Sequence, residues 1–301
     1  MSIRTPSTTQ SRQALLDLER TKERLSLNQT RISSGNRITR PGDDPTAAAA
    51  ILNFGDSIQA NTQFVRQADA AIGFLTSSED VVASAISSVE RLQELTQTGS
   101  SSSAAEVDSI RTSLLSLANT QSQGKYLFAG TQTQGTAAHP LPFEDAAAPA
   151  GPINYWGNSG SITLSVTGTT TVSTNIPGDT TFFGAGGQGS NTDLFKAVTD
   201  LRDGLATNNT ALITTASANL KNSLDNLIKV RTDLGGRQSG LLDLKDTLSG
   251  FNVTLEGLQN TQQDTDYAKA ATEYSSDQTI QSASLSVMAR TNKTNLFDYL
   301  A

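Results

Sequence analysis

The chain has 301 residues, of which 36% are hydrophobic and 5% aromatic, and carries a formal net charge of -7 with a pI near 4.8. The acidic balance argues against nucleic acid and anionic membranes as partners, because both require a basic surface. The absence of cysteine excludes disulfides, zinc–thiolate sites and thiol nucleophiles. No segment has the length and apolarity of a membrane span, and residues 1–10 lack a signal-peptide core, so we expect any export to proceed without a cleaved signal.

The residue pattern changes twice along the chain. It is helical over about 8–130, Gly- and Thr-rich with short strand-like stretches over about 131–189, and helical again over about 192–300. This order predicts a mainly α fold, in which a long antiparallel helical bundle or coiled coil is built from both chain ends and a small β-rich insert lies in the middle. Three separate domains in a row are the alternative. The expected parts are terminal helices over 1–40 and 260–301, a helical bundle over 41–135 and 190–259, and an outward-facing insert over 136–189.

The first helical segment carries a thin apolar stripe. Leu18, Leu25 and Ile32 recur every seven residues. The alternating heptad positions hold small or polar residues: Ala14, Thr21 and Asn28. A stripe this thin cannot stabilise an isolated helix, because its burial does not offset the conformational entropy lost when the helix forms. We therefore predict that the terminal helices are disordered in the monomer and order against other copies of the chain; pairing of the two ends within one monomer is the alternative.

The next segment, RPGDDP, contains two adjacent carboxylates, which are potential metal ligands. No further acidic residues cluster nearby, and Asp44 before Pro45 suits a helix N-cap followed by proline at the first helical position. We predict that Asp43, Asp44 and Pro45 form a structural loop and cap. Three arginines flank the loop and could pair with these aspartates or with a neighbouring subunit: Arg31, Arg37 and Arg40.

Heptad patterns continue through both halves of the predicted bundle. One series is Ile72, Leu75, Val82, Ile86 and Val89. Glu79 occupies the heptad position expected between Leu75 and Val82. The longest unbroken series of three- and four-residue steps is Leu241, Leu244, Leu248, Phe251, Leu255 and Leu258. We predict that these segments pack as long, nearly antiparallel helices and that the apolar positions are ordinary core residues.

The middle zone reads as short strands on a projection from the helical body. Residues Ser161 to Ser173 are rich in Thr, Val and Ile and alternate partly, which favours a strand. Trp156, Phe182 and Phe183 are the expected small core of this insert.

Candidate catalytic residues are few. The single histidine, His139, precedes a proline and has no second histidine for a metal pair, so we interpret it as a loop residue. Gly184, Gly186 and Gly189 spell GxGxxG, but neither the buried strand before it nor the repeated strand–helix pattern after it is present, which favours a flexible hinge over a dinucleotide site. We expect no cofactor, no metal and no enzyme activity.

Two terminal segments carry a resemblance to a known family. ERLSLNQTRISSGNRITRPGDDPTAAA (Glu23–Ala49) and DYAKAATEYSSDQTIQSASLSVMARTNKTNLFDYL (266–300) resemble the signatures of the flagellin-like axial proteins of bacterial flagella. Three features are similar to the hook–filament junction members rather than to flagellin: DDP where flagellin more usually has DDAAG, GKYLFAGTQT at 124–133, and the ending TNLFDYL. Asn36 and Gly42 depart from residues that are commonly Lys and Ser in this loop, which weakens inferences about loop contacts.

The resemblance implies a secreted structural subunit that forms a ring in the flagellum. Its expected partners are further copies of itself, a neighbouring hook-associated protein on the hook side, flagellin on the filament side, and an export chaperone at the carboxyl end. Export would use the flagellar type III apparatus. Flagellin itself is the alternative function, and adhesion through the insert stays open. Carried onto this chain, the assembly interface comprises Leu18, Leu25, Ile32, Ile280, Val287, Leu296 and Phe297.

Overall fold

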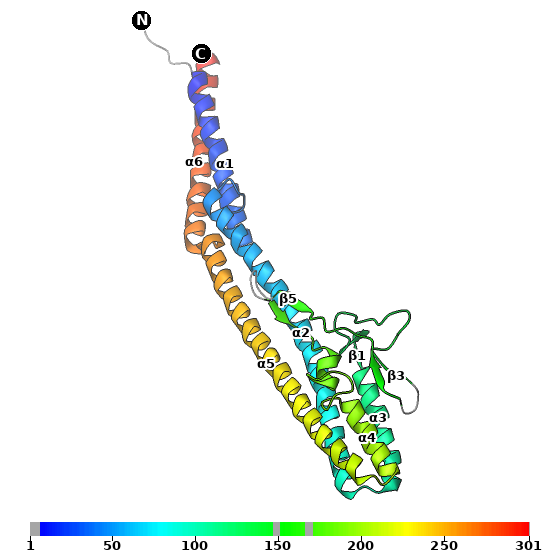
Figure 1. Cartoon of the computed structure of the whole chain (residues 1–301). Coiled ribbons are helices and arrows are strands. Elements are labelled where there is room, and N and C mark those ends of the chain that lie inside the picture. The colour runs from blue at the N-terminus through cyan, green and yellow to red at the C-terminus, as the bar shows by residue number, and fades with distance from the viewer. Residues whose placement is uncertain (1–6, 147–150, 166–170, 301) are drawn as a thin grey trace. The chain divides into compact units, whose positions relative to one another are not determined.

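The computed structural model of the chain describes residues 7–146, 151–165 and 171–300, and the side chains of these residues except at 7–8, 10–11 and 291–300. The chain is mainly helical with short strands in the middle, as predicted (Figure 1). Its elements are α1 (Ser7–Ser34), α2 (Pro45–Thr98), η1 (Ser101–Ser103), α3 (Ala104–Ala118), β1 (Gln121–Ser122), β2 (Lys125–Tyr126), β3 (Phe143–Asp145), β4 (Ile153–Tyr155), β5 (Thr163–Ser165), β6 (Thr171–Ser173), η2 (Asp179–Phe183), α4 (Leu194–Ala206), α5 (Thr210–Gln263) and α6 (Tyr267–Leu300).

The chain divides into two compact units. We call residues 1–60 with 251–301 the end unit and residues 61–250 the core unit. Helices α2 and α5, each of 54 residues, contribute to both. The two units are described separately below.

In the core unit, α2 and α5 run antiparallel. Lys245 Nζ lies 2.7 Å from Asp69 Oδ1, and Arg231 Nε lies 2.9 Å from Glu79 Oε1. The predicted α2 heptad is confirmed by the burial of its Leu and Val side chains, but the position between Leu75 and Val82 is occupied by buried Ser78. Glu79 instead points to α5, where its carboxylate pairs with the guanidinium of Arg231.

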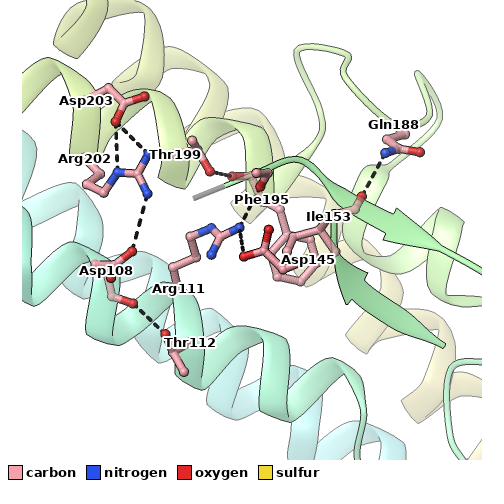
Figure 2. Close-up of polar contacts among 11 residues, drawn as sticks. Asp108, Arg111, Thr112, Asp145, Ile153, Gln188, Phe195, Thr199, Arg202 and Asp203 are labelled. Atoms are coloured by element: carbon pink, nitrogen blue, oxygen red, sulfur yellow. Dashed lines mark hydrogen bonds and ion pairs between the residues drawn. The ribbon is translucent and has the colours of Figure 1, made fainter. Parts of the chain in front are cut away.

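Helices α3 and α4 add a second layer to the core unit. Asp193 caps α4 by accepting a hydrogen bond from the Lys196 amide at 3.1 Å. On the facing sides of the helices, Arg202 Nη1 of α4 lies 3.5 Å from Asp108 Oδ1 of α3 (Figure 2). The apolar face of α4 is fully buried through Leu194, Phe195, Ala197, Val198, Leu201 and Leu205.

Within the described residues, the β-rich zone contains three two-stranded antiparallel hairpins: β1–β2, β3–β4 and β5–β6. The stretch Ser161 to Ser173, in the zone predicted to form short strands, contains two of them, β5 and β6, with Thr163 paired to Ser173 and Leu164 to Val172. The zone also begins at Gln121, earlier than the predicted boundary at 136, and Gly124 with φ +74° turns the chain between β1 and β2.

An aromatic cluster joins this zone to the helices. Phe182 and Phe183 are buried as predicted, and the ring of Phe143 packs edge-on against Phe182 at 5.3 Å between centroids. The prediction for Trp156 is wrong: its side chain is 41% exposed and stacks on His139, with ring centroids 3.5 Å apart. The core position belongs instead to Phe143, the first residue of β3, which lies in a stretch whose sequence gave no strand signal.

Buried polar contacts hold the zone against the helices. Arg111 of α3 is only 2% exposed; its Nη2 lies 2.8 Å from Asp145 Oδ2 and donates to the Gly151 carbonyl oxygen at 2.7 Å (Figure 2). The side-chain Nδ2 of Asn226 on α5 donates to the backbone carbonyl oxygens of Thr180 and Thr181. The β-rich zone is therefore tied to the helical body at several points along its length.

The glycine segment predicted as a hinge is a set of tight turns. Gly184 and Gly189 have φ of +68° and +78°, which glycine adopts without strain. The Gly189 amide donates to Asp193 Oδ2 at 2.7 Å, and Thr192 Oγ1 donates to the Phe183 carbonyl at 2.7 Å. These turns lead the chain into the N-cap of α4, which explains the glycines without a moving hinge.

The longest predicted heptad series is buried in only part of its length. Leu241 and Leu248 are buried, but Phe251 and Leu258 are exposed, so the prediction of ordinary core packing is wrong for the carboxyl-terminal part of the series. The change coincides with the boundary between the core unit and the end unit.

Candidate assembly surface

In the end unit, α1 and α6 lie side by side and run antiparallel (Figure 1). At one end of the pair the Thr265 amide donates to the Gly35 carbonyl oxygen at 2.8 Å, and further along, Arg24 Nη2 lies 3.1 Å from Asp277 Oδ1. The two terminal helices thus pair within a single chain, which is the alternative that the sequence left open. Whether they are also disordered before assembly stays a prediction.

The burial pattern of α1 follows the heptad predicted from the sequence. Leu18 is buried and Leu25 and Ile32 are half-buried, which places the predicted apolar stripe on the seam with α6. The alternating positions are as deeply shielded as the apolar ones: Ala14 is half-buried, and Thr21 and Asn28 are buried. Leu18, Leu25 and Ile32 therefore already have a partner within the chain.

The seam of α6 does not include Ile280 and Val287, the two α6 residues of the predicted assembly interface whose side chains are described. Its shielded residues recur in steps of four and three and are mostly small or polar: Ala270, Tyr274, Asp277, Gln281, Ser284 and Met288. Ile280 and Val287 lie outside this seam, with 42% and 63% of their surface exposed. The predicted stripe is thus divided between an internal seam on α1 and an outward surface on α6. Leu296 and Phe297, also predicted, lie outside the residues whose side chains are described.

A polar cluster occupies the middle of the seam. Asp277 is 8% exposed, and its carboxylate faces Arg24 at 3.1 Å and accepts a hydrogen bond from Asn28 Nδ2 at 3.3 Å. A buried carboxylate requires such partners, because desolvation of an unpaired charge is costly. Thr21, one turn away, satisfies its hydroxyl within α1 by donating to the Asp17 carbonyl oxygen at 2.8 Å.

The loop and cap predicted at Asp43, Asp44 and Pro45 have the expected geometry. Asp44 Oδ1 accepts from the Ala47 amide at 3.1 Å and caps α2, which begins at Pro45. Asp43 Oδ2 accepts from the Arg40 amide at 2.9 Å and from the Thr39 amide at 3.1 Å.

These backbone donors also set the charge state of the two aspartates. The Arg40 amide, followed by that of Thr39, holds the pKa of Asp43 below its usual value, and the Ala47 amide does the same for the pKa of Asp44. Both carboxylates are therefore ionised acceptors that organise the loop. Within the described residues, no group of three or more His, Asp or Glu side chains could hold a metal ion.

Arg37 ties this loop to the turn between α5 and α6. Its amide donates to the Gln263 carbonyl at 2.6 Å, its Nη2 donates to the Gln262 carbonyl at 2.9 Å, and its Nη1 lies 3.4 Å from Asp44 Oδ2. Arg31 donates to the Arg37 carbonyl at 3.0 Å. Of the alternatives open for the three arginines, the structure thus gives Arg37 an intrachain aspartate and Arg31 an intrachain carbonyl.

The end unit leaves many large apolar side chains on its surface. The sequence patterns did not single out several of them, because they lie off the heptad seams. A scan for apolar residues on the polar faces of the terminal helices would have found them. The exposed set is Leu15 and Leu16 on α1, Leu52 on α2, Phe251, Val253 and Leu258 on α5, and Tyr267, Ile280, Leu285 and Val287 on α6.

Comparison with known proteins gives this surface a context. The bacterial flagellin N-terminal helical region matches residues 7–133, and the flagellin C-terminal helical region matches residues 217–300. Together they cover more than two thirds of the chain. The chain belongs to the flagellin-like family of flagellar axial proteins. No helix in the described part of this family member has the length and apolarity of a membrane span.

Three individual proteins are similar to this member of the flagellin-like family. The flagellar hook-associated protein 3 of Salmonella typhimurium is 28% identical over 256 residues, covering 76% of this chain and 77% of its own. That of Escherichia coli is 28% identical over 241 residues, covering 71% and 73%. The flagellar junction protein FlgL of Legionella pneumophila shares the fold, with a TM-score of 0.55 and 17% identity over 73% of this chain and all of its own. These relatives are structural flagellar proteins. They support the alternative function, flagellin, less well than a role at the junction.

Proposed function

We propose that this chain is a structural adaptor at the flagellar hook–filament junction and that it polymerises through its end unit. One observation carries the assembly part of the proposal: the end unit exposes large apolar side chains while it shields polar ones between α1 and α6. Large apolar side chains exposed together on one unit favour an interaction role for it, because burial of apolar surface releases about 25 cal/mol per Å². The names of the relatives support the junction as the place of assembly.

The partners follow from that place. Copies of the same chain would form a ring, a hook-associated protein would contact it on the hook side, and flagellin would contact it on the filament side. Export without a cleaved signal suits an end unit whose internal seam is polar, because a weak helix pair opens easily before secretion. A chaperone would then cover exposed apolar residues of α6 such as Ile280 and Leu285 until export.

The test uses two neighbouring substitutions on α6. Val287→Asp places a charge on the exposed apolar surface, whereas Ser286→Asp adds the same charge next to it without removing an apolar side chain. Both variants should keep the thermal stability of the soluble chain within about 0.5 kcal/mol, because both side chains are exposed. In cells that lack their own copy, Ser286→Asp should restore retained filaments, and Val287→Asp should be secreted into the medium without restoring them.

Retention of filaments by the Val287→Asp cells would contradict assembly through this surface. Detection of the secreted variant in the medium separates failed assembly from failed export. The proposed position of the chain at the hook–filament junction is tested independently. Cells that lack this chain should secrete flagellin but not retain it on completed hooks. Long homopolymers formed by the purified chain alone would favour a filament subunit instead.

A further inference from the structure

The heptad of α1 leaves the register of the α1–α6 pair open. Leu18, Leu25 and Ile32 recur at seven-residue intervals, so sliding α6 by one heptad places equivalent α1 side chains against it. On α6 the seam is small or polar at most positions, so packing differences between registers are small as well. The hydrogen bonds of Gly35 and Arg37 align the pair at one end, and a further specific contact is needed to hold that alignment along the two helices.

We infer that Asp277 is the residue that fixes the register of the terminal helix pair. Its carboxylate is shielded between the helices, and the observed register brings it a cation, Arg24, at 3.1 Å and an amide donor, Asn28, at 3.3 Å. Only a register that supplies such partners avoids the cost of a desolvated carboxylate. A single buried polar residue specifies alignment in coiled coils by the same physics.

The two neighbouring registers are both unfavourable. A slide of seven residues in one direction moves Asp277 from Arg24 and Asn28 to Asp17 and Thr21, where it meets a like charge. The opposite slide moves it towards Arg31 but carries the end of the pair past Gly35, where α1 has ended. Either slide also breaks the hydrogen bonds that Gly35 and Arg37 make with the turn before α6.

The register decides which side chains of the end unit face outward. In the observed alignment Ile280 and Val287 flank the seam on one side of α6, because residues 277, 280 and 287 fall at different angles around a helix of 3.6 residues per turn. A slipped pair would keep its helices but present these residues about 10 Å away along the axis, since seven residues rise 1.5 Å each. The consequence for assembly rests on the proposed function, whereas the register itself is a property of the single chain.

Disulfide trapping in the purified full chain tests the inference, because the chain has no cysteine of its own. The antiparallel contacts predict that Thr21 faces Gln281 in the observed register and Tyr274 in the slide towards Asp17. The pair T21C/Q281C should therefore oxidise readily and T21C/Y274C should not, since a disulfide needs Cα atoms closer than about 7 Å. Adding D277A should raise the yield of the slipped T21C/Y274C disulfide by about tenfold, the effect expected from losing a charge-assisted hydrogen bond.

The conservative variant D277E serves as the rescue, because it keeps a carboxylate that can pair with Arg24 in the observed register and is repelled by Asp17 in the slipped one. It should return the slipped disulfide to the level of the unsubstituted background. An unchanged disulfide pattern in D277A, or a loss of the in-register disulfide without any slipped product, would overturn the inference, since a residue that only stabilises the pair gives the second result. Circular dichroism confirms that each variant stays helical. Filament retention by cells carrying D277A is scored separately, so that a failure of the proposed junction role leaves the trapping result intact.

Discussion

The core unit and the end unit use long heptad-patterned helices in opposite ways. In the core unit the buried positions of α2 and α5 are mostly apolar, chiefly Leu, Val and Ala, and the aromatic side chains of the β-rich zone complete a continuous apolar core. In the end unit the corresponding seam holds Thr21, Asn28 and Asp277, and the large apolar side chains lie on the outside. All but three of the buried apolar residues in the described chain belong to the core unit; the three are Leu18, Ala47 and Ala270.

This difference separates folding from assembly. The core unit buries a large cluster of apolar side chains, and this burial stabilises its fold, because removal of apolar surface from water is the main favourable term in folding. The end unit gains little from its own seam and has much to gain from neighbours. A subunit that must remain soluble until it reaches its place benefits from keeping the two tasks in different parts of the chain.

The largest effect is expected in the aromatic cluster of the core unit. Phe143→Ala removes a fully buried ring that lies 4.9 Å from Tyr155 and 5.3 Å from Phe182, measured between centroids. The free energy of unfolding of the core unit should fall by about 3–5 kcal/mol, the usual cost of such a cavity. Chemical denaturation measures it, with exposed Leu141→Ala as the control that should change little. Equal losses for both variants would mean that this cluster is not the core.

A smaller effect is expected on the seam of the end unit. Leu25→Asp introduces a charge at a half-buried seam position, so the melting of the α1–α6 pair should be destabilised by roughly 1–2 kcal/mol. Leu16→Asp on the exposed side of the same helix should leave that melting almost unchanged. Thermal melting followed by circular dichroism compares the two. If both variants melt alike, α1 does not pack against α6 in solution by the face described above.

The smallest effect is expected in the loop of Asp43 and Asp44. Backbone amides lower the pKa of both carboxylates in the folded chain. Their contribution to stability is therefore complete above the ordinary pKa near 3.8 and is lost as the pH falls through the lower folded value. Amide exchange of Arg40 and Ala47 should accelerate relative to intrinsic rates as the pH falls below the ordinary aspartate pKa near 3.8. Replacing both aspartates by asparagine, which keeps an acceptor without titration, should flatten this dependence; a step that persists would have another origin.

Much of the fold was accessible from local patterns. The helical thirds, the cap at Asp44 and the burial of Phe182 and Phe183 follow from capping chemistry and apolar periodicity, which act over a few residues. The exposed position of Trp156 and the burial of Phe143 were not accessible, because they depend on which loop reaches the cluster of Phe182 and Phe195. The end of core packing after Leu248 could not be predicted for the same reason. An unbroken heptad shows which residues share one face of a helix, but only the tertiary structure shows what packs against that face.

The candidate assembly surface shows the same division. By itself, the sequence determined that the chain is mainly helical, that its terminal helices have thin heptad stripes, and that their motifs resemble flagellin-like proteins. Only the tertiary structure decided that Leu18, Leu25 and Ile32 face α6 within the chain while Ile280 and Val287 face outward. Periodicity fixes which residues share a face of one helix, but the pairing of two faces is set by contacts between residues about 250 positions apart, such as Asn28 with Asp277.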